Sequence, residues 1–211
     1  MRDPNRPWYR FAHCLFPTDP GRWIDLGCGQ GEFVARAGLG HTLTPMVLDR
    51  SRANVAAARA TGAIGLVADL DARLPFADEA FDGVAMIEVI EHIPRAERLV
   101  DELARVLRPG GWLILTTPNV AHLTYRLRAL TGHPPKQEGY HARFFTEKTL
   151  RACLLSSGFR IEARASFGKQ ALVTKLLRLT GRDRGYKFRY RVPRAFERLL
   201  AQHFVWRLRR R

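Results

Sequence analysis

The chain has 211 residues, 46% of them hydrophobic, which fits one α/β domain with appendages. Its formal net charge of +15 points to an anionic partner. Its three cysteines are odd in number and never spaced C-x-x-C, which argues against a disulfide scaffold and a cysteine metal cluster. No uninterrupted apolar stretch reaches the about 18 residues of a membrane span, so we expect a cytoplasmic protein.

The first predicted strand runs into three alternate glycines, Gly27, Gly29 and Gly31. Glycines at this spacing permit a tight strand-to-helix turn with positive φ and let a ligand approach the backbone closely. The pattern G-x-G-x-G differs from the G-x-G-x-x-G that cradles a dinucleotide pyrophosphate. Asp25 precedes the glycines, and a carboxylate there repels phosphate and attracts an ammonium group. The motif therefore favours a ligand with an amino group and a ribose, such as S-adenosylmethionine.

A helix over residues 32–37 and a strand over residues 44–48 are predicted next, and the strand ends at Asp49. Asp49 lies 18 residues past Gly31. At about this distance a βαβ unit delivers an acidic side chain to the ribose hydroxyls, where one carboxylate accepts two O–H bonds. An alanine-rich helix over residues 52–60 follows.

Two further strands are predicted, over residues 64–68 and 81–87. Asp69 follows the first of them at the same edge of the sheet as Asp49, so we expect it to accept a hydrogen bond from the adenine amino group. The second is almost wholly apolar, as is typical of a strand buried on both faces of a parallel sheet.

Pro94 opens a predicted helix that ends near Leu107, where the residues Arg-Pro-Gly-Gly stop it, and a fifth strand covers residues 112–116. Strands and helices thus alternate five times. Short connections in that order require right-handed crossovers, which predicts a doubly wound, mostly parallel α/β sheet in a three-layer sandwich. Ligands in such folds bind outside the carboxyl ends of the strands.

Three segments carry a family resemblance: residues 25–31 (DLGCGQG), 81–92 (FDGVAMIEVIEH) and 107–111 (LRPGG). In this order they resemble the motifs of class I S-adenosylmethionine-dependent methyltransferases, a family with a Rossmann-like fold. The resemblance implies a methyltransferase whose cofactor is S-adenosylmethionine, with Glu88 near its methionine end. The predicted cofactor-binding residues are Asp25, Gly27, Cys28, Gly29, Gly31, Asp49, Arg50, Asp69, Leu70 and Glu88.

A narrower resemblance lies in residues 117–122, 126–132 and 141–146, which are similar to a bacterial branch of small-molecule O-methyltransferases. Members of that branch are associated with surface polysaccharide, lipid or quinone biosynthesis. The resemblance implies a small or lipid-linked hydroxyl acceptor, although a shared fold does not identify the acceptor.

Three histidines are candidates for catalysis. Methyl transfer is an in-line displacement in which a positioned base helps a hydroxyl lose its proton, and histidine suits that task. His92, His122 and His141 all follow strands at the expected edge, and His141 is the preferred base. If residues 88–92 are helical, His92 pairs with Glu88.

No metal site is predicted, because Asp101 and Asn119 do not form the oxygen-rich cluster that a divalent ion needs. Nucleic acid is a disfavoured acceptor, because the Asn/Asp-Pro-Pro-aromatic signature for a flipped base is missing after the fourth strand. The carboxylates of Glu88 and Glu91 would also oppose a phosphate backbone.

The charge is concentrated at the C-terminal end, where residues 160–211 hold 16 basic and 3 acidic residues, a net of +13. After Pro193, apolar residues at helical spacing predict a basic amphipathic helix, and residues 171–179 predict another. The first helix either lies on an anionic membrane or packs on the domain, and we favour packing. The apolar positions are Phe196, Leu199, Leu200, Phe204 and Leu208.

These predictions give a helical extension over residues 1–20, a methyltransferase domain over residues 21–165 and a basic cap or tail over residues 166–211. Two alternatives stay open: a nucleic-acid or protein methyltransferase that uses the tail, and a non-catalytic partner subunit. A nicotinamide dehydrogenase is disfavoured, because the third glycine comes one residue early and no Tyr-x-x-x-Lys pair is present. The atom that is methylated and the oligomeric state stay open.

Overall fold

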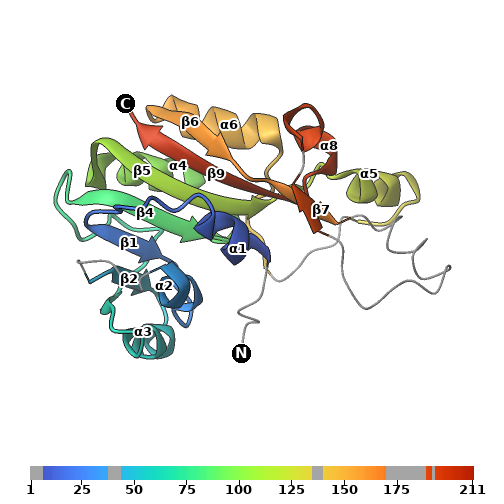
Figure 1. Ribbon diagram of the computed structural model, residues 1–211. Helices are drawn as coiled ribbons and strands as arrows, with labels where there is room; N and C mark the ends of the chain where they lie inside the picture. Colours follow the sequence, from blue (N-terminus) through green and yellow to red (C-terminus); the bar gives the residue numbers. More distant parts are fainter. Residues whose placement is uncertain (1–6, 38–43, 135–139, 170–188, 192) are drawn as a thin grey trace.

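The computed structural model describes residues 7–37, 44–134, 140–169, 189–191 and 193–211. Its centre is a sheet in which the first five strands run parallel and β9 runs antiparallel to β5 and β6 (Figure 1). The strand order is β3 (Ile64–Val67), β2 (Met46–Asp49), β1 (Trp23–Leu26), β4 (Phe81–Ile87), β5 (Leu107–Pro118), β9 (His203–Arg210), β7 (Phe167–Lys169) and β8 (Arg189–Arg191), and β6 (Phe159–Arg164) also pairs with β9.

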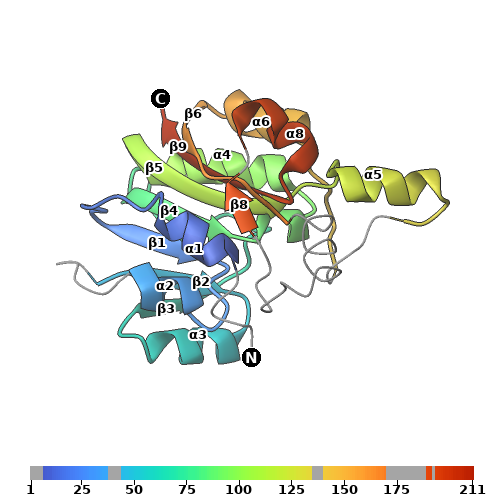
Figure 2. The ribbon, with the colours of Figure 1, turned by 45° about the vertical axis from the view of Figure 1, so that its right-hand side comes forward.

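Helices cover both faces of this sheet, which confirms the predicted three-layer, doubly wound fold (Figure 2). One core cluster joins the sheet to α4 (Ala96–Val106) and α6 (Glu147–Ser156). The other joins it to α1 (Pro7–His13), α2 (Glu32–Ala37) and α3 (Arg52–Arg59). Within the residues that the structure describes, the other helices are η1 (Ile90–His92), α5 (Leu123–Leu130), η2 (Arg194–Phe196) and α8 (Glu197–Leu200).

The elements predicted up to β4 are confirmed within one or two residues, and β4 covers the predicted range of 81–87. The Arg-Pro-Gly-Gly segment differs from the prediction. It ends α4 but lies inside β5, as a bulge between the pair Phe81 and Leu107 and the pair Gly83 and Trp112. Gly110 in this bulge has a φ of +74°, which allows the strand to continue after the irregularity.

The predicted amphipathic helix after Pro193 is wrong over its second half. Helical residues end at Leu200, and residues 203–210 form β9 between β5 and β6. Phe204 and Leu208 are four residues apart, as on a helix face, but Trp206 between them packs into the same core cluster. This is the two-residue period of a strand, with Val205 on the opposite face.

Several arginines at the C-terminal end have structural partners. Arg207 and Arg209 pair with Glu162 of β6 at 2.7 and 3.1 Å, and Arg210 contacts Glu79 at 3.5 Å. These residues therefore fasten β9 to its neighbours rather than forming a free basic face. The predicted helix over residues 171–179 lies outside the described residues. Among those that are described, no helix has the length and hydropathy to cross a bilayer.

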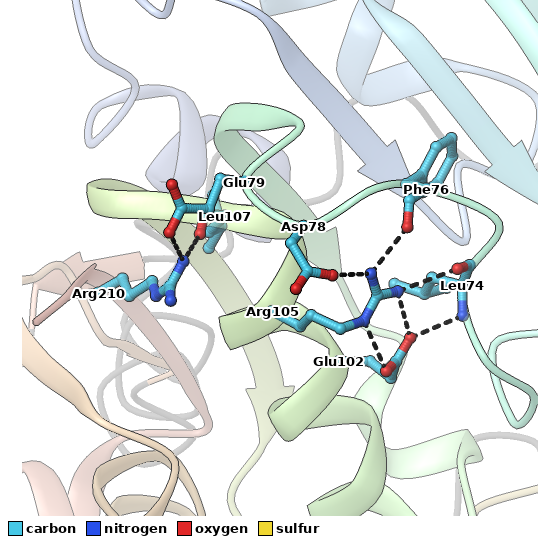
Figure 3. A network of polar contacts seen from close by, with 8 residues as sticks. All are labelled: Leu74, Phe76, Asp78, Glu79, Glu102, Arg105, Leu107 and Arg210. Carbon is cyan, nitrogen blue, oxygen red and sulfur yellow. Dashed lines mark hydrogen bonds and ion pairs between the residues drawn. The ribbon is translucent and has the colours of Figure 1, made fainter.

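Arg105 fastens the loop before β4 to α4, and through this contact it supports the sheet edge (Figure 3). All five of its N–H groups are used: two bond the Glu102 carboxylate, two bond the carbonyls of Leu74 and Phe76, and one bonds Asp78, at 2.7 to 3.0 Å. These partners raise the pKa of Arg105, with Glu102 the largest cause.

Candidate active site

A cavity of about 750 Å³ lies at the carboxyl ends of β1 to β5. It extends from the glycine loop after β1 to the segments that follow β4 and β5. Nine of the predicted site residues line it: Gly27, Gly29, Asp49, Arg50, Asp69, Leu70, Glu88, His92 and His141.

The glycine loop has the left-handed backbone that the sequence predicts, with φ of +70° at Gly27, +55° at Gly29 and +85° at Gly31. A Cβ at Gly27 would lie 2.5 Å from a methyl group of Val89, and one at Gly31 would lie 2.9 Å from the Cα of Ala58. Only glycine therefore fits this turn, which keeps the cavity open at its floor.

Asp49 holds the glycine loop in place. Its Oδ2 accepts a hydrogen bond from the Gly29 amide at 3.0 Å, and its Oδ1 accepts one from the Ser51 amide at 2.8 Å. Each carboxylate oxygen keeps a further lone pair. Asp49 can thus position the loop and still accept hydrogen bonds from ribose hydroxyls, as predicted.

Asp25 and Glu32 add negative charge beneath this loop. Asp25 is 2% exposed, and burial, followed by the charges of Glu32 and Asp49, raises its pKa well above the usual range. Both carboxylate oxygens of Glu32 are buried and have no hydrogen-bond partner among the described residues, although Glu32 lines the cavity. An ammonium group bound here would satisfy these oxygens.

At one end of the cavity, Asp69 and the buried side chain of Leu70 follow β3. Asp69 Oδ1 accepts the Asp71 amide at 2.9 Å. Asp71 in turn pairs with Arg95 at 2.9 Å, and the hydrogen bond from Arg95 lowers the pKa of Asp71. This end combines an acidic acceptor with an apolar surface, which suits an adenine ring.

At the other end, Glu88 has a φ of +58°, which is strained for a residue with a side chain. The hydroxyl of Thr116 accepts the Glu88 amide at 2.9 Å and donates to Glu88 Oε1 at 2.8 Å. Oε2 contacts His203 Nε2 at 3.1 Å. The predicted pairing of Glu88 with His92 is therefore wrong, because residues 88–89 are not helical and Glu88 turns toward β9.

His92 and His141 meet near Glu88. Their ring centroids lie 5.0 Å apart at an angle of 70°, and both side chains line the cavity beside the buried carboxylate of Glu91. The base role predicted for His141 stays a prediction. His122 does not reach the cavity: it caps the N-terminus of α5, and burial lowers its pKa.

Cys28 and Gly31 lie behind the cavity surface rather than on it. Burial raises the pKa of the Cys28 thiol, which keeps it protonated at neutral pH, and its Sγ donates to the Gly29 carbonyl at 3.5 Å. Both residues shape the turn, and so does Asp25, which lies beneath it on β1.

The sequence did not single out several residues of the site. Trp8 and Tyr9 of α1 reach the cavity across the sheet, and Tyr140 and Pro118 complete its wall. His203 stacks on Phe167 at 5.1 Å and lies 4.9 Å from the ring of Trp8. The aromatic residues at the start of the chain were the one available signal, and their contacts depend on the tertiary fold.

The residues present fit S-adenosylmethionine on two grounds. At Gly27 the loop forms a cradle that a Cβ would obstruct, because it would lie 2.5 Å from Val89 on the cavity wall, and the buried oxygens of Glu32, which have no hydrogen-bond partner among the described residues, match an ammonium cation. Asp49 and Asp69 line the same cavity, and their roles toward the ribose and the adenine stay predictions.

Comparisons with known proteins agree with this site. A family model described as "Methyltransferase domain" matches residues 5–164. A ubiquinone biosynthesis O-methyltransferase of Xylella fastidiosa is 30% identical over 163 residues, which is 69% of this chain and 63% of that protein. A probable tRNA methyltransferase 9B of Bos taurus is 36% identical over 115 residues, which is 53% of this chain and 24% of that protein.

Among solved structures, an S-adenosylmethionine-dependent methyltransferase from Mesorhizobium loti has the same fold, with a TM-score of 0.67, 22% identity and coverage of 99% of both chains. The chain spans between 24% and 65% of the length of the curated relatives it matches. The names of these relatives refer to different substrates or pathways, tRNA in one and ubiquinone biosynthesis in another, so similarity does not identify the acceptor of this chain.

Proposed function

This chain belongs to the S-adenosylmethionine-dependent methyltransferase family, and we propose that it methylates a hydroxyl group of a small or lipid-linked acceptor. One observation carries the proposal: a single cavity joins the cofactor-binding loop at Gly27 to the polar cluster at His92 and His141. Cofactor and acceptor would therefore meet in one cavity, as in-line transfer requires.

When bound, S-adenosylmethionine supplies an electrophilic methyl group on a positively charged sulfur. The chain's own residues would bind and orient it. Asp49 would accept hydrogen bonds from the ribose hydroxyls, and Asp69 would accept one from the adenine amino group; both line the cavity. Asp25 and Glu32 attract the ammonium group, while Glu88 faces the methionine end.

The acceptor would enter at the opposite end, between His92, His141 and Tyr140. Apolar side chains of Trp8, Val89 and Ile93 border the same space and limit access of water, which would otherwise compete with the acceptor. A ubiquinone O-methyltransferase among the relatives supports a hydroxyl acceptor, and a tRNA methyltransferase among them supports the alternative of a nucleic acid.

A lipid-linked acceptor would bring the protein to the inner face of a membrane. The net charge of +13 in residues 160–211 supports this location, because that sum already includes Glu162, the partner of Arg207 and Arg209. Arg151, Arg160 and Arg194 border a second cavity of about 660 Å³ on the α6 side of the molecule, where anionic headgroups would bind. Sedimentation with anionic vesicles tests this part, and binding that does not fall with added salt would argue against it.

Calorimetry with S-adenosylmethionine and with NAD tests the cofactor, and we expect heat from the first alone. Transfer of labelled methyl groups to separate quinone, sugar, lipid and tRNA fractions then tests the acceptor. Label in a hydroxyl of the first three supports the proposal, whereas label confined to tRNA supports the alternative. A protein that binds no S-adenosylmethionine would overturn both.

A further inference from the structure

Three side chains able to bind a metal ion gather at the acceptor end of the cavity. Glu91, His92 and His141 each offer a ligand atom, and these atoms lie within 4.8 Å of one another. Glu91 is 2% exposed, while the two histidines are half-buried and line the cavity. The sequence predicted no metal site, because its Asp and Asn residues do not cluster and these three ligands come from segments about fifty residues apart.

Hydrogen bonds around this cluster fix the orientation of its members. His92 Nδ1 contacts the carbonyl oxygen of Tyr140. Because a carbonyl can only accept, Nδ1 carries the proton and Nε2 carries the lone pair that a metal requires. A histidine ligand whose second nitrogen donates to a carbonyl is the usual arrangement in metal sites.

Glu91 is fixed in a similar way. Its Oε2 accepts a hydrogen bond from the hydroxyl of Thr117 at 3.0 Å. Its backbone carbonyl accepts the amides of Ala142 and Arg143, both at 2.9 Å, and these bonds hold the residues after His141 against η1. The three side chains are therefore positioned by their surroundings before any ligand arrives.

We propose that Glu91, His92 and His141 bind a divalent cation. Two imidazoles and one carboxylate suit Zn²⁺, Mn²⁺ or Fe²⁺, and three protein ligands leave coordination positions open toward the cavity. Those positions fit an acceptor with two adjacent oxygens, such as a catechol or a vicinal diol, which chelates the ion through both.

In the proposed function the cation would activate the acceptor hydroxyl, and this role rests on that proposal. A hydroxyl bound to a divalent cation ionises at a lower pH, because the ion stabilises the oxyanion. The O–H bond breaks, both electrons stay on the oxygen and the proton passes to solvent water. The same oxygen is then the nucleophile for methyl transfer. Binding of the cation itself does not depend on that function.

The test begins with protein freed of metal by a chelator and titrated calorimetrically with Zn²⁺ and Mn²⁺, and with Co²⁺ followed by its visible absorption. We expect one site per chain. His92→Ala and His141→Ala should each weaken metal binding by about 10- to 100-fold or more. Removing a residue that hydrogen-bonds to a metal ligand already costs that much affinity, and removing the ligand itself should cost no less. The matched control is His133→Ala, because His133 is exposed and lies outside the cavity.

Binding of S-adenosylmethionine is measured on the same samples. Metal binding that is lost in both histidine variants, with cofactor binding retained, supports the site. Metal binding that is absent, or equal in the variants and the control, overturns it. If the cofactor still binds in that case, the proposed function stands and His141 remains as the base. Failure of cofactor binding alone overturns the proposed function and leaves the metal site intact.

Discussion

His203 Nε2 lies 3.1 Å from Glu88 Oε2, so the C-terminal strand β9 supports a carboxylate of the candidate active site. Glu88 needs this support because its backbone is held at a φ of +58°, a conformation that costs on the order of 1–3 kcal/mol. Thr116 of β5 provides the second contact through its hydroxyl. The C-terminal strand β9 therefore helps to position Glu88 in the candidate active site.

Replacing His203 should weaken cofactor binding. We expect His203→Leu to raise the Kd for S-adenosylmethionine by about 5- to 30-fold, equivalent to about 1–2 kcal/mol for a lost hydrogen bond to a charged group. His203→Gln keeps a donor and should lose less. Calorimetry measures both. The matched control is Leu208→Ala, which disturbs the buried core of β9 at a position that pairs with Leu113 and not with Thr116. Equal loss of affinity in all three variants would mean that β9 acts only through stability.

Gly27 and Gly62 separate backbone strain from the shape of the cavity. Both have positive φ, +70° at Gly27 and +88° at Gly62. A Cβ added at Gly27 would lie 2.5 Å from the side chain of Val89, whereas a Cβ added at Gly62 would have no neighbouring heavy atom within 4 Å among the described residues. Each Ala variant should lose about 1–2 kcal/mol of stability from strain. Only Gly27→Ala should also lose cofactor binding, by more than about tenfold. Thermal melts and calorimetry check this pair, and intact binding in Gly27→Ala would contradict the cradle described above.

The sequence predicted the parallel half of the sheet well, because its signals are local. A largely apolar segment of seven residues bounded by turns predicted β4, and the glycine spacing after β1 predicted the turn that borders the cavity. Asp49 and Asp69 could be placed for the same reason. Asp49 ends β2 and Asp69 follows β3, and parallel strands end at a common edge.

The C-terminal strand and the completed site could not be predicted in this way. Phe204, Trp206 and Leu208 satisfy a two-residue period, but Phe204 and Leu208 alone also satisfy a helical one, and only pairing with β5 decides between them. The contact between Trp8 and His203 joins opposite ends of the chain. The approach of His141 to His92 likewise depends on backbone bonds to Glu91, for which the sequence carries no local signal.

Arg105 should matter for stability and not for chemistry. Its five donors are all satisfied, two of them by the carbonyls of Leu74 and Phe76, and it is only 17% exposed (Figure 3). Arg105→Lys cannot reproduce this planar set and should cost about 2–4 kcal/mol of unfolding free energy. The ion pair of Arg108 with Asp82 is the matched control, because Arg108 is 58% exposed. Arg108→Lys should cost less than about 1 kcal/mol of unfolding free energy. Denaturant unfolding measures both, and equal costs would contradict the assignment of Arg105 as an anchor.

Asp25 should lower the stability of the apoprotein near neutral pH and raise the affinity for S-adenosylmethionine. Burial first, and then the nearby Glu32 and Asp49 carboxylates, raise its pKa well above the usual range. A carboxyl group whose folded pKa exceeds its unfolded pKa contributes most to stability below the unfolded value of about 3.9, and that contribution is lost as pH rises through the folded pKa. Between these two pKa values the unfolded state gains free energy by ionising and the folded state does not gain it, a disadvantage that Asp25→Asn does not have.

We expect the melting temperature of Asp25→Asn apoprotein to match that of the parent near pH 4 and to exceed it increasingly as pH rises toward 7. Its affinity for S-adenosylmethionine should fall, because the variant lacks the charge that attracts the ammonium group. Thermal melts across this pH range and calorimetry at pH 7 measure the two effects. Asp101→Asn is the control, since Asp101 is exposed and far from the glycine loop in sequence. A constant loss of stability in Asp25→Asn at every pH would mean that the carboxylate instead makes a hydrogen bond that the amide cannot replace.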